Sequence, residues 1–567
     1  MKNIYSYLQS IKPYDFSGVR EDIAGDDFVF KNDFNNIDSL PILNGNLGNY
    51  ALQVLAKHPT KIVLTDYTTD KPRVLRAGML LAISLLLAKK FKKYINERRV
   101  GIALPAGAGS HIANLALLLA NKTPVNLNFS VGRSTIESAI EQAGIKTVIS
   151  TNALLEKFPQ FPRPKNVLDL PKIISKLHKF SIIWLLIEIY LTPVSMLARR
   201  FKIPTVGGDS EATLLFSSGT TGKPKGIVLS HKNIIANCLQ IKMLGIVKSS
   251  DSILASLPIF HSFGMLINVW FCLLFGIRTA TCPSPLDIRK IADVIAKEKI
   301  SLNISTPTFF RQYLGKASPE SMRSLRAVAA GGEKVNIDLI DLWEKTFSSE
   351  MVAGYGLTEA SPVVSLNFPR ENQTKIINGK RGSVGRVVPG ISVKFIGPET
   401  GKPMPLGETG ILCIKGPNVF KKYLNDEVLT NQSIRDGWLV TGDLARLDPD
   451  GFLYIEGRIS RFSKIGGEMV PHVGLEEAIS KVLSLTHEDG PEIAIMSKVD
   501  KRKGESLILL TEKEVNMQFL REKLLQAGIS ALWIPKTYIL VDDIPSLTTG
   551  KLDLGACKQI VESRLLS

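Results

Sequence analysis

The chain has 567 residues, a formal net charge of +17 and 44% apolar residues. Because a single hydrophobic core rarely grows beyond about 300 residues, two or three domains are expected. The composition is globular and excludes a disordered or collagen-like chain. Residues 461–567 carry 14 Lys and Arg against 15 Asp and Glu, so the basic excess lies in residues 1–460. Such a surface attracts anionic lipid, acidic protein or nucleic acid, but without a zinc-finger spacing, RNA-recognition motif or arginine-rich tail no nucleic acid partner is expected.

Cysteine usage and the N-terminus indicate a reducing compartment. The five cysteines lie far apart without a CxxC pair, which predicts buried thiols. The first 16 residues, MKNIYSYLQSIKPYDF, lack the continuous apolar core of a signal peptide. We therefore expect a cytoplasmic protein whose residues 1–49 form an N-terminal extension.

Two apolar runs with basic flanks are candidates for helices. Residues 77–88 precede KKFKK, and we expect a core helix with a polar end. Residues 181–198 are interrupted by Glu188 and Pro193 and fall short of the about 20 apolar residues that cross a bilayer. Because residues 172–202 hold six Lys and Arg and one acid, the run suits a helix in the headgroup layer at the inner face of the cell membrane. A core helix with solvated basic ends is the alternative, and both stay open.

Short apolar strands alternate with helical patterns between residues 50 and 350, which predicts layered α/β sheets with covering helices. After Pro362, hairpin signals such as PETGKP and DPDG separate strand-like runs, which predicts a β-rich subdomain over about 363–460 within a large domain of residues 50–460. The expected strands are 100–104, 123–128, 147–151, 391–397, 409–415 and 452–456, with a helix over 110–120.

Residues 461–567 are long enough for an independent domain. The pattern predicts a helix, two strands around the charged turn KVDKRKGES, a second helix and a last strand, which makes a small α+β domain. The expected ranges are 474–483, 492–498, 505–511, 516–527 and 537–541.

The loop SSGTTGKPKG, at 217–226, lies between two strand-like runs and is suited to hold phosphate. Glycines let backbone N–H groups approach an anion closely, hydroxyls add donors and lysines add charge. The spacing is not that of a Walker loop. A flexible turn is the alternative. The candidate phosphate-binding residues are Ser217, Ser218, Gly219, Thr220, Thr221, Gly222 and Lys225.

Further motifs follow this loop in a fixed order, and together they resemble the adenylate-forming superfamily of acyl-CoA synthetases, peptide synthetase adenylation domains and luciferases. The resemblance implies that a carboxylate attacks the α-phosphate of ATP, with Mg²⁺ spreading the phosphate charge. The motifs are SLPIFHSFG (256–264), AAGGEKV (329–335), GYGLTEASP (354–362), GWLVTGD (437–443), GRISRFSKIGGE (457–468) and TTGKL (548–552).

The resemblance assigns roles to single residues of these motifs. It makes Glu359 the Mg²⁺ ligand, Thr358 a donor to the α-phosphate and Tyr355 the ring that stacks on adenine. The residues implied to line the adenine and acyl site are Gly331, Gly332 and Glu333.

Four more positions take part in the implied chemistry. Asp443 accepts both ribose hydroxyls, with Arg458 beside it. Lys551 bridges the substrate carboxylate and the α-phosphate. His261 gates the carboxylate site, with a core histidine as the alternative, and the nearby Phe260, Phe263 and Trp270 are candidates for an acyl-pocket wall, with plain core packing as the alternative.

The resemblance also implies a mobile C-terminal domain that swings after adenylation. The hinge falls at Ser460, where the family usually carries Asp or Lys. After rotation, Lys464 and Gly467 would face the tunnel of the phosphopantetheine thiol.

The details are most similar to the acyl-ACP synthetase half of bacterial acylglycerophosphoethanolamine acyltransferase/acyl-ACP synthetase proteins. SAIEQAGIKTVIST (138–151), the basic-apolar insertion at 172–202, RGSVGRVVPG (381–390) and KIGGEMV (464–470) carry this likeness. It implies a fatty acid and acyl carrier protein as partners. CoA as the acceptor is one alternative, and an inactive lipid-binding protein at the membrane surface is another.

Overall fold

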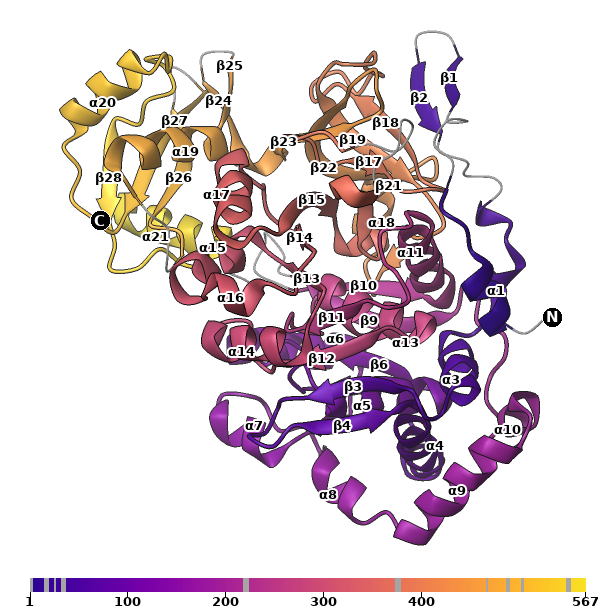
Figure 1. Cartoon of the computed structure of the whole chain (residues 1–567). Helices are drawn as coiled ribbons and strands as arrows, with labels where there is room; N and C mark the ends of the chain where they lie inside the picture. Colours follow the sequence, from indigo (N-terminus) through magenta and orange to yellow (C-terminus); the bar gives the residue numbers. More distant parts are fainter. Residues whose placement is uncertain are drawn as a thin grey trace.

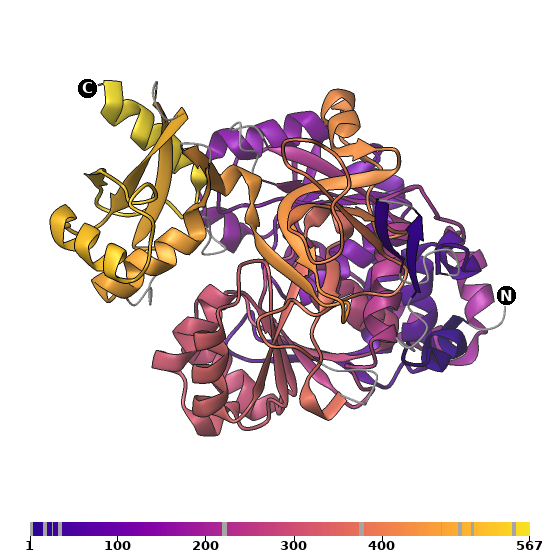
Figure 2. The same cartoon turned by 90° about the horizontal axis from the view of Figure 1, so that it is seen from above.

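The computed structural model describes residues 4–14, 20–24, 27–31, 37–217, 224–372, 379–465, 468–485, 490–500, 504–546 and 552–566. Two largely parallel sheets with helices around them form the main body, a β-rich sheet lies beside them, and the C-terminal elements gather as a separate unit at upper left in Figure 1. Figure 2 shows the same unit attached at one side of the molecule. This is the architecture that the alternation of strands and helices predicts.

The first sheet has the strand order β20-β10-β9-β6-β5-β7-β8. The strands from β8 to β9 pair in parallel, as strands joined by helical crossovers can. Strand β10 pairs antiparallel with both β9 and β20. The bounds are β5 Arg99–Ile102, β6 Thr123–Asn126, β7 Thr147–Ser150, β8 Asn166–Asp169, β9 Glu211–Ser217, β10 Lys225–Ser230 and β20 Lys422–Tyr423.

The second sheet has the order β17-β16-β15-β14-β13-β11-β12-β3-β4 and is parallel from β15 to β3. Two of its strands, β16 and β17, come from the segment expected to belong to the β-rich subdomain. The bounds are β3 Ile62–Asp66, β4 Arg73–Arg76, β11 Ser252–Ala255, β12 Arg278–Thr281, β13 Leu302–Ser305, β14 Ala327–Ala330, β15 Glu350–Gly356, β16 Val363–Leu366 and β17 Arg386–Val387.

The β-rich sheet is antiparallel, in the order β1-β2-β18-β19-β22-β21 with β23 on β22. Because β2 pairs with β18, part of the expected N-terminal extension belongs to this sheet. The bounds are β1 Arg20–Ala24, β2 Asp27–Lys31, β18 Ser392–Ile396, β19 Gly410–Lys415, β21 Ile434–Arg435, β22 Trp438–Leu447 and β23 Leu453–Arg458.

The C-terminal unit has a sheet of its own, in the order β25-β24-β27-β26 with β28 on β27. Helix α19 packs on this sheet through Leu475 and Ile479, both of which are buried. The bounds are β24 Phe462–Ile465, β25 Glu468–Pro471, α19 His472–Leu483, β26 Ile493–Asp500, β27 Gly504–Thr511, α20 Met517–Gln526, β28 Thr537–Leu540 and α21 Leu554–Leu566.

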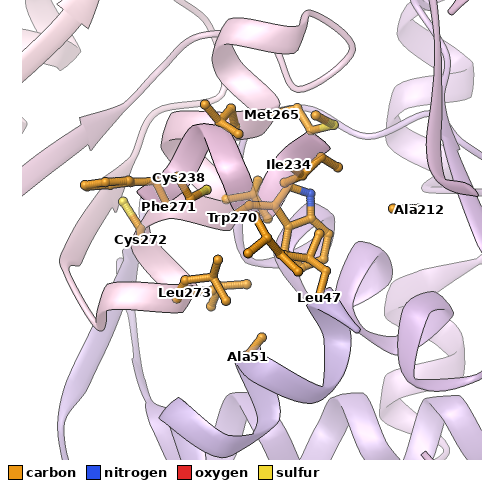
Figure 3. Close-up of a cluster of buried hydrophobic side chains, with 14 of the residues drawn as sticks. Leu47, Ala51, Ala212, Ile234, Cys238, Met265, Trp270, Phe271, Cys272 and Leu273 are labelled. Carbon is orange, nitrogen blue, oxygen red and sulfur yellow. The ribbon is translucent and has the colours of Figure 1, made fainter. Parts of the chain in front are cut away.

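Helices between and around the two parallel sheets form the main core. Figure 3 shows Trp270, fully buried, among side chains of α3 and α11, including Leu47, Ala51 and Ile234. The helix bounds are α1 Ile4–Ser10, α3 Leu47–Lys57, α4 Ala77–Tyr94, α5 Ala108–Leu119, α6 Arg133–Ala143, α7 Asn152–Lys157, α11 His231–Met243, α12 Ser262–Gly264, the π-helix η3 Met265–Phe271, α13 Cys272–Phe275, α14 Ile288–Glu298, α15 Pro307–Lys316, α16 Pro319–Met322, α17 Ile337–Phe347 and α18 Glu427–Ser433.

Short single turns complete the large domain. Of these, η4 carries predicted site residues, and η6 leads into the C-terminal unit. The bounds are η2 Pro41–Asn44, η4 Thr358–Ala360, η5 Arg370–Asn372 and η6 Ile459–Arg461.

The two apolar runs with basic flanks differ in how much of each the fold buries. Helix α4 is buried along most of its length, as the core-helix prediction requires. The run 181–198 is broken at Pro193 into α9 (Lys179–Leu191) and α10 (Val194–Arg200), which follow α8 (Leu170–Ser175) along the lower edge in Figure 1. Most of α9 is exposed, so its core-helix alternative is wrong. No helix within the described ranges is long and apolar enough to cross a membrane.

All five cysteines are buried and free, as their isolated positions predict. Burial raises the pKa of Cys413 and Cys557 to about 11, so these thiols stay protonated at neutral pH.

Candidate active site

A cavity of about 850 Å³ lies where the two parallel sheets, the β-rich sheet and the C-terminal unit meet. The predicted site residues Ser217, Lys225, His261, Gly331, Gly332, Glu333, Tyr355, Thr358, Glu359, Asp443 and Arg458 all line it. They come from six motifs that are far apart in the sequence, and the fold brings them to one place.

The cavity follows the direction of the parallel strands. Leu302 and Ala327 lie opposite each other at the start of β13 and β14, and Ser305 pairs with Ala330 at the other end. Apolar side chains line the cavity near the strand starts, and polar groups line it beyond the strand ends. The apolar end consists of Ile241, Ile246, Val247, Ile253, Phe271, Leu302 and Ala327, and the polar end of Tyr355, Thr358, Glu359, Asp443 and Arg458.

Asp443 lies between two hydrogen-bond donors at the polar end of the cavity. The pairing of β22 with β23 places it opposite Arg458, whose Nε donates to Oδ1 at 3.0 Å. The Tyr355 hydroxyl donates to Oδ2 at 2.5 Å. The Asp443 side chain is only 3% exposed, so both of its oxygens are held in place by partners.

The surroundings also keep the two donors, Tyr355 and Arg458, protonated. Burial, and then the Asp443 carboxylate, raise the pKa of Tyr355 well above its usual value, so the phenol remains a donor. The same carboxylate raises the pKa of Arg458. A carboxylate with two neighbouring donors and an open cavity beside it suits a ligand with paired hydroxyls, as the sequence predicts for ribose.

The turn η4 carries Thr358 and Glu359 at the end of β15. The Glu359 carboxylate accepts from the Tyr423 hydroxyl at 2.8 Å, and its carbonyl accepts from the Phe420 N–H at 2.8 Å. The hydroxyls of Thr358 and Ser262 lie 3.2 Å apart. The turn is therefore tied to β20 and to the start of α12, which fixes its side chains toward the cavity.

The fit of Mg²⁺ rests on Glu359. No cluster of three or more His, Cys, Asp or Glu side chains that could hold a metal occurs among the residues that the structure describes. Mg²⁺ does not need one, because it is usually held by one or two carboxylates, several waters and phosphate oxygens. Tyr423 engages only Oε1 of Glu359, and the half-buried carboxylate faces the cavity, so the donor set fits an ion that arrives with a nucleotide.

The strands β9 and β10 bring Ser217 and Lys225 together as directly paired residues at the cavity. Gly226 allows close packing behind them, since a Cβ there would lie 2.8 Å from the Cβ of Leu424. The remaining residues of the predicted phosphate loop, Ser218, Gly219, Thr220, Thr221 and Gly222, lie outside the described residues.

Gly331, Gly332 and Glu333 follow directly after β14. Gly332 has a φ of +84°, which favours glycine. The Glu333 carboxylate accepts from the N–H and the hydroxyl of Thr308, at 3.2 and 2.6 Å, and so joins the segment to the start of α15. These contacts hold a small-residue wall beside the cavity.

His261 precedes α12 and lines the cavity, half-buried, with its ring centroid 4.8 Å from that of Phe260. This position does not support the core-histidine alternative. Phe260 and Phe263 also line the cavity. Trp270 does not belong to the described lining, because π-helix η3 turns it into the core between α3 and α11, so for this candidate the plain-core alternative is confirmed.

The C-terminal unit also reaches the cavity, through Val473 and Leu552 to Gly555. Lys464 lies on β24. The predicted catalytic Lys551 and the tunnel residue Gly467 lie outside the described residues. Their roles stay predictions.

Ser460 is exposed in the single turn η6, between the last strand of the β-rich sheet and β24. On its far side, the buried Arg461 donates to Glu476 at 2.5 Å and to the carbonyl of Ile495 at 3.1 Å, inside the C-terminal unit. A hinge at Ser460 is compatible with this position.

Sequence reasoning missed Tyr423, Thr308 and Ser262, which hold Glu359, Glu333 and Thr358. Ser262 lies inside a recognised motif and was within reach of prediction. Tyr423 and Thr308 lie in unremarkable segments, and only the fold places them beside the site.

A model of the AMP-binding enzyme family matches residues 55–424, which is more than half of the chain. The chain belongs to the AMP-binding enzyme family. This AMP-binding enzyme is 26% identical over 544 residues to the long-chain-fatty-acid–CoA ligase of Bacillus subtilis, an alignment that covers 90% of this chain and 94% of that one. It is 34% identical over 301 residues to the probable 4-coumarate–CoA ligase 3 of Dictyostelium discoideum, of which the alignment spans about half, 52% of each chain.

Solved structures share the fold. The O-succinylbenzoate coenzyme A synthetase of Bacillus subtilis in complex with AMP matches with a TM-score of 0.73 at 22% identity, covering 89% of this chain and 96% of that one. An anthranilate CoA ligase in complex with anthranoyl-AMP matches with a TM-score of 0.75 at 20% identity, covering 94% and 100%. The predicted fold class is therefore confirmed. At this identity the likeness is one of fold.

Proposed function

We propose that this AMP-binding enzyme uses ATP and Mg²⁺ to activate a medium- or long-chain fatty acid as its acyl adenylate. A phosphopantetheine thiol then attacks the acyl carbon, the bond to AMP breaks, and a thioester and AMP are formed. The observation that carries the proposal is that one and the same cavity has a polar end suited to a nucleotide and an apolar end suited to an alkyl chain. Membership of the AMP-binding family supports the first part, and the name of the Bacillus subtilis relative supports a fatty acid.

The apolar end has the chemistry and the room for an alkyl chain. Strand β14 and the start of its following loop contribute alanines and glycines, whose small side chains leave space along the strand. From Ala327 to Gly331 the strand runs about 13 Å at about 3.3 Å per residue. Branched and aromatic side chains from α11, β11 and η3 surround this length, so burial of methylene groups stabilises a bound chain by about 0.8 kcal/mol for each CH₂.

The proposed reaction takes place where the two ends meet. A carboxylate oxygen of the fatty acid attacks the α-phosphorus of ATP, the bond to the β-phosphate oxygen breaks, and pyrophosphate leaves. Asp443 and Arg458 hold the ribose, Tyr355 stacks on the adenine, and Thr358 donates to the α-phosphate. Mg²⁺, held by Glu359, would spread the charge of the phosphates. The positive charge of Lys551 offsets the negative charges of the substrate carboxylate and of the α-phosphate oxygens as these groups approach each other.

The test of acyl adenylate formation is fatty-acid-dependent ATP–pyrophosphate exchange by the full-length protein, measured with acids of eight to eighteen carbons. Exchange that depends on the acid supports the proposal. A protein that binds the acid but never exchanges pyrophosphate would instead fit the inactive lipid-binding alternative.

The variant Lys551→Ala separates the two half-reactions. We expect exchange to fall by about 10²-fold or more, because the charge that bridges the reacting oxygens is removed, while thioester formation from supplied acyl adenylate is largely kept. Lys558→Ala is the matched control, since Lys558 is an exposed lysine on α21. Equal damage to both steps would contradict the role of Lys551.

For the acceptor we propose acyl carrier protein, because this acidic partner complements the first 460 residues of the chain, which carry 56 Lys and Arg against 38 Asp and Glu. CoA is the second candidate, and the names of the ligase relatives favour it. Thioester formation with holo-carrier protein and with CoA at equal concentration decides between them. A higher kcat/KM for CoA at low and at physiological salt would overturn the carrier-protein assignment.

A further inference from the structure

The helices α8 to α10, residues 170–200, form a strap along one edge of the large domain, far from the C-terminal unit in Figure 1. Helix α9 packs against α4 through the buried residues Leu185 and Ile189. Its opposite side carries large apolar side chains at helical spacing. These are Phe180, Ile183, Trp184, Ile187, Tyr190 and Leu191, which are 87%, 54%, 66%, 46%, 53% and 79% exposed, and Met196 on α10 follows them at 56%.

This exposed apolar face has no partner within the described chain. A helix that is apolar all round is normally buried on all sides. Here the body of the protein covers only one side of α9. The other large exposed apolar side chains of the described ranges are scattered singly or in pairs, so this face is the place where they gather.

The charges of the strap are arranged for an anionic surface. Glu188 is the only acid in residues 170–202, its side chain is 10% exposed, and it is paired with Arg200 at 2.5 Å. The exposed side of α9 therefore carries no negative charge. The exposed basic residues of the strap are Lys172, Lys176, Lys179, Arg199 and Arg200, and the exposed Lys202 follows directly after it.

The end of α4 extends the basic border. Lys92 donates to the carbonyls of Phe201 and Lys202, at 2.7 and 2.9 Å, so the last turn of α4 lies beside the end of α10. Lys89 and Lys93 are exposed on the same last turns. A patch of apolar side chains bordered by lysines and arginines matches the apolar boundary and the anionic headgroups of a lipid leaflet.

We propose that the strap is a membrane anchor, in which α9 lies flat in the headgroup layer of an anionic bilayer with Trp184 and Tyr190 at the interface. Both rings combine an apolar body with a polar tip, as side chains at membrane interfaces do. A second copy of the chain fits less well, because it would bring the same basic border against this one. Anchoring through the strap leaves the opposite end of the molecule, with the C-terminal unit, away from the bilayer.

The test is flotation of the full-length protein with vesicles, without ATP or fatty acid, so that it is independent of the proposed reaction. We expect binding to phosphatidylglycerol vesicles and at least tenfold weaker binding to phosphatidylcholine vesicles. Binding should weaken further as salt is raised, because headgroup attraction is screened. Removing one border lysine, as in Lys176→Gln, should weaken binding about fivefold.

The triple variant Ile183→Gln, Trp184→Gln and Ile187→Gln should lose at least tenfold in partitioning. The triple control Leu286→Gln, Leu342→Gln and Val428→Gln changes side chains of similar exposure elsewhere and should bind as the unmodified protein does. Near-ultraviolet circular dichroism verifies that both variants are folded. Equal flotation of the two variants would overturn the proposal, and so would an unmodified protein that stays unbound at low salt.

Trp184 supplies a second readout, because the other four tryptophans, at 270, 343, 438 and 533, are buried or half-buried. We expect lipids brominated near the headgroup to quench the emission. Trp184→Phe should remove this quenching while keeping most of the binding. Quenching that persists in this variant, or dimer formation in solution that the triple variant abolishes, would show that the face has another occupant.

Discussion

The two ends of the cavity are built in different ways. At the polar end, side chains hold one another through directed contacts, such as Tyr355 and Arg458 on Asp443 and Tyr423 on Glu359. At the apolar end, Ile253, Leu302 and Ala327 define a space only by their volumes. Hydrogen bonds fix where reacting atoms lie, whereas packing fixes how much chain is accommodated. Changes at the polar end should therefore lower the rate for every acid, and changes at the apolar end should alter the choice of acid.

The largest effect is expected for Asp443→Ala. It removes the acceptor proposed for both ribose hydroxyls and leaves Arg458 and Tyr355 without their partner. We expect kcat/KM in ATP–pyrophosphate exchange to fall by about 10³-fold, the loss of two to three charge-assisted hydrogen bonds. The fall should be the same for eight-carbon and sixteen-carbon acids. A loss that depends on chain length would break the division between the two ends.

Glu359→Gln should come next, with a loss of about 10²-fold at low Mg²⁺ concentration. The substitution keeps the size of the side chain and its contact with Tyr423 but removes the negative charge that a divalent cation needs. A titration with Mg²⁺ is the measurement, and partial recovery at high concentration is expected. An unchanged Mg²⁺ dependence would show that the ion is held elsewhere.

Ala327→Leu acts at the opposite end. The added side chain occupies space at the start of β14, where Ala327 is buried and lines the cavity. We expect the longest accepted acids to lose about 30-fold in kcat/KM and the shorter acids to be little affected. Ala327→Val should give an intermediate shift, and thermal unfolding checks that the fold is kept. Equal losses for all acids would contradict the assignment of the apolar end.

Tyr423→Phe should have the smallest effect. It removes one hydrogen bond to Glu359, worth about 1 kcal/mol, so we expect about a fivefold weaker response to Mg²⁺ with no change in acid preference. Tyr454→Phe is the matched control, because its hydroxyl donates to Asp448 at 3.3 Å and its ring is outside the described lining of the cavity. If the two variants responded equally to Mg²⁺, this would contradict the role of Tyr423 in holding Glu359.

The same contrast explains what the sequence could predict. The polar end comes from short contiguous motifs, such as GYGLTEASP and GWLVTGD, whose residue types are unusual enough to identify. The apolar end is assembled from Ile241, Ile253 and Leu302, which look like any core residue. Trp270, for which both a pocket wall and plain core packing were open, packs into the core. Volume around a ligand depends on which side of an element faces inward, and that is decided by tertiary packing.

The helices and strands themselves were easier to predict from the sequence than the cavity walls. The expected strand at 409–415 is β19, Gly410–Lys415, and the expected helix at 474–483 is α19, His472–Leu483. The runs of α4 and α9 show the limit, because both are apolar with basic ends, yet one is buried and the other exposed. Periodicity finds a helix, but the amount of its surface that neighbours cover is a property of the whole fold.

Two arginines flank the short segment of residues 459–460. Arg458 is tied to Asp443 in the large domain, and Arg461 is tied to Glu476 in the C-terminal unit. Only Ile459 and Ser460 lie between these anchors, so their few backbone dihedrals must absorb any turn of one body relative to the other. For the rotation that the family resemblance predicts, so short a connection would act as a pivot, and little chain entropy would be lost when the two bodies reach a new orientation.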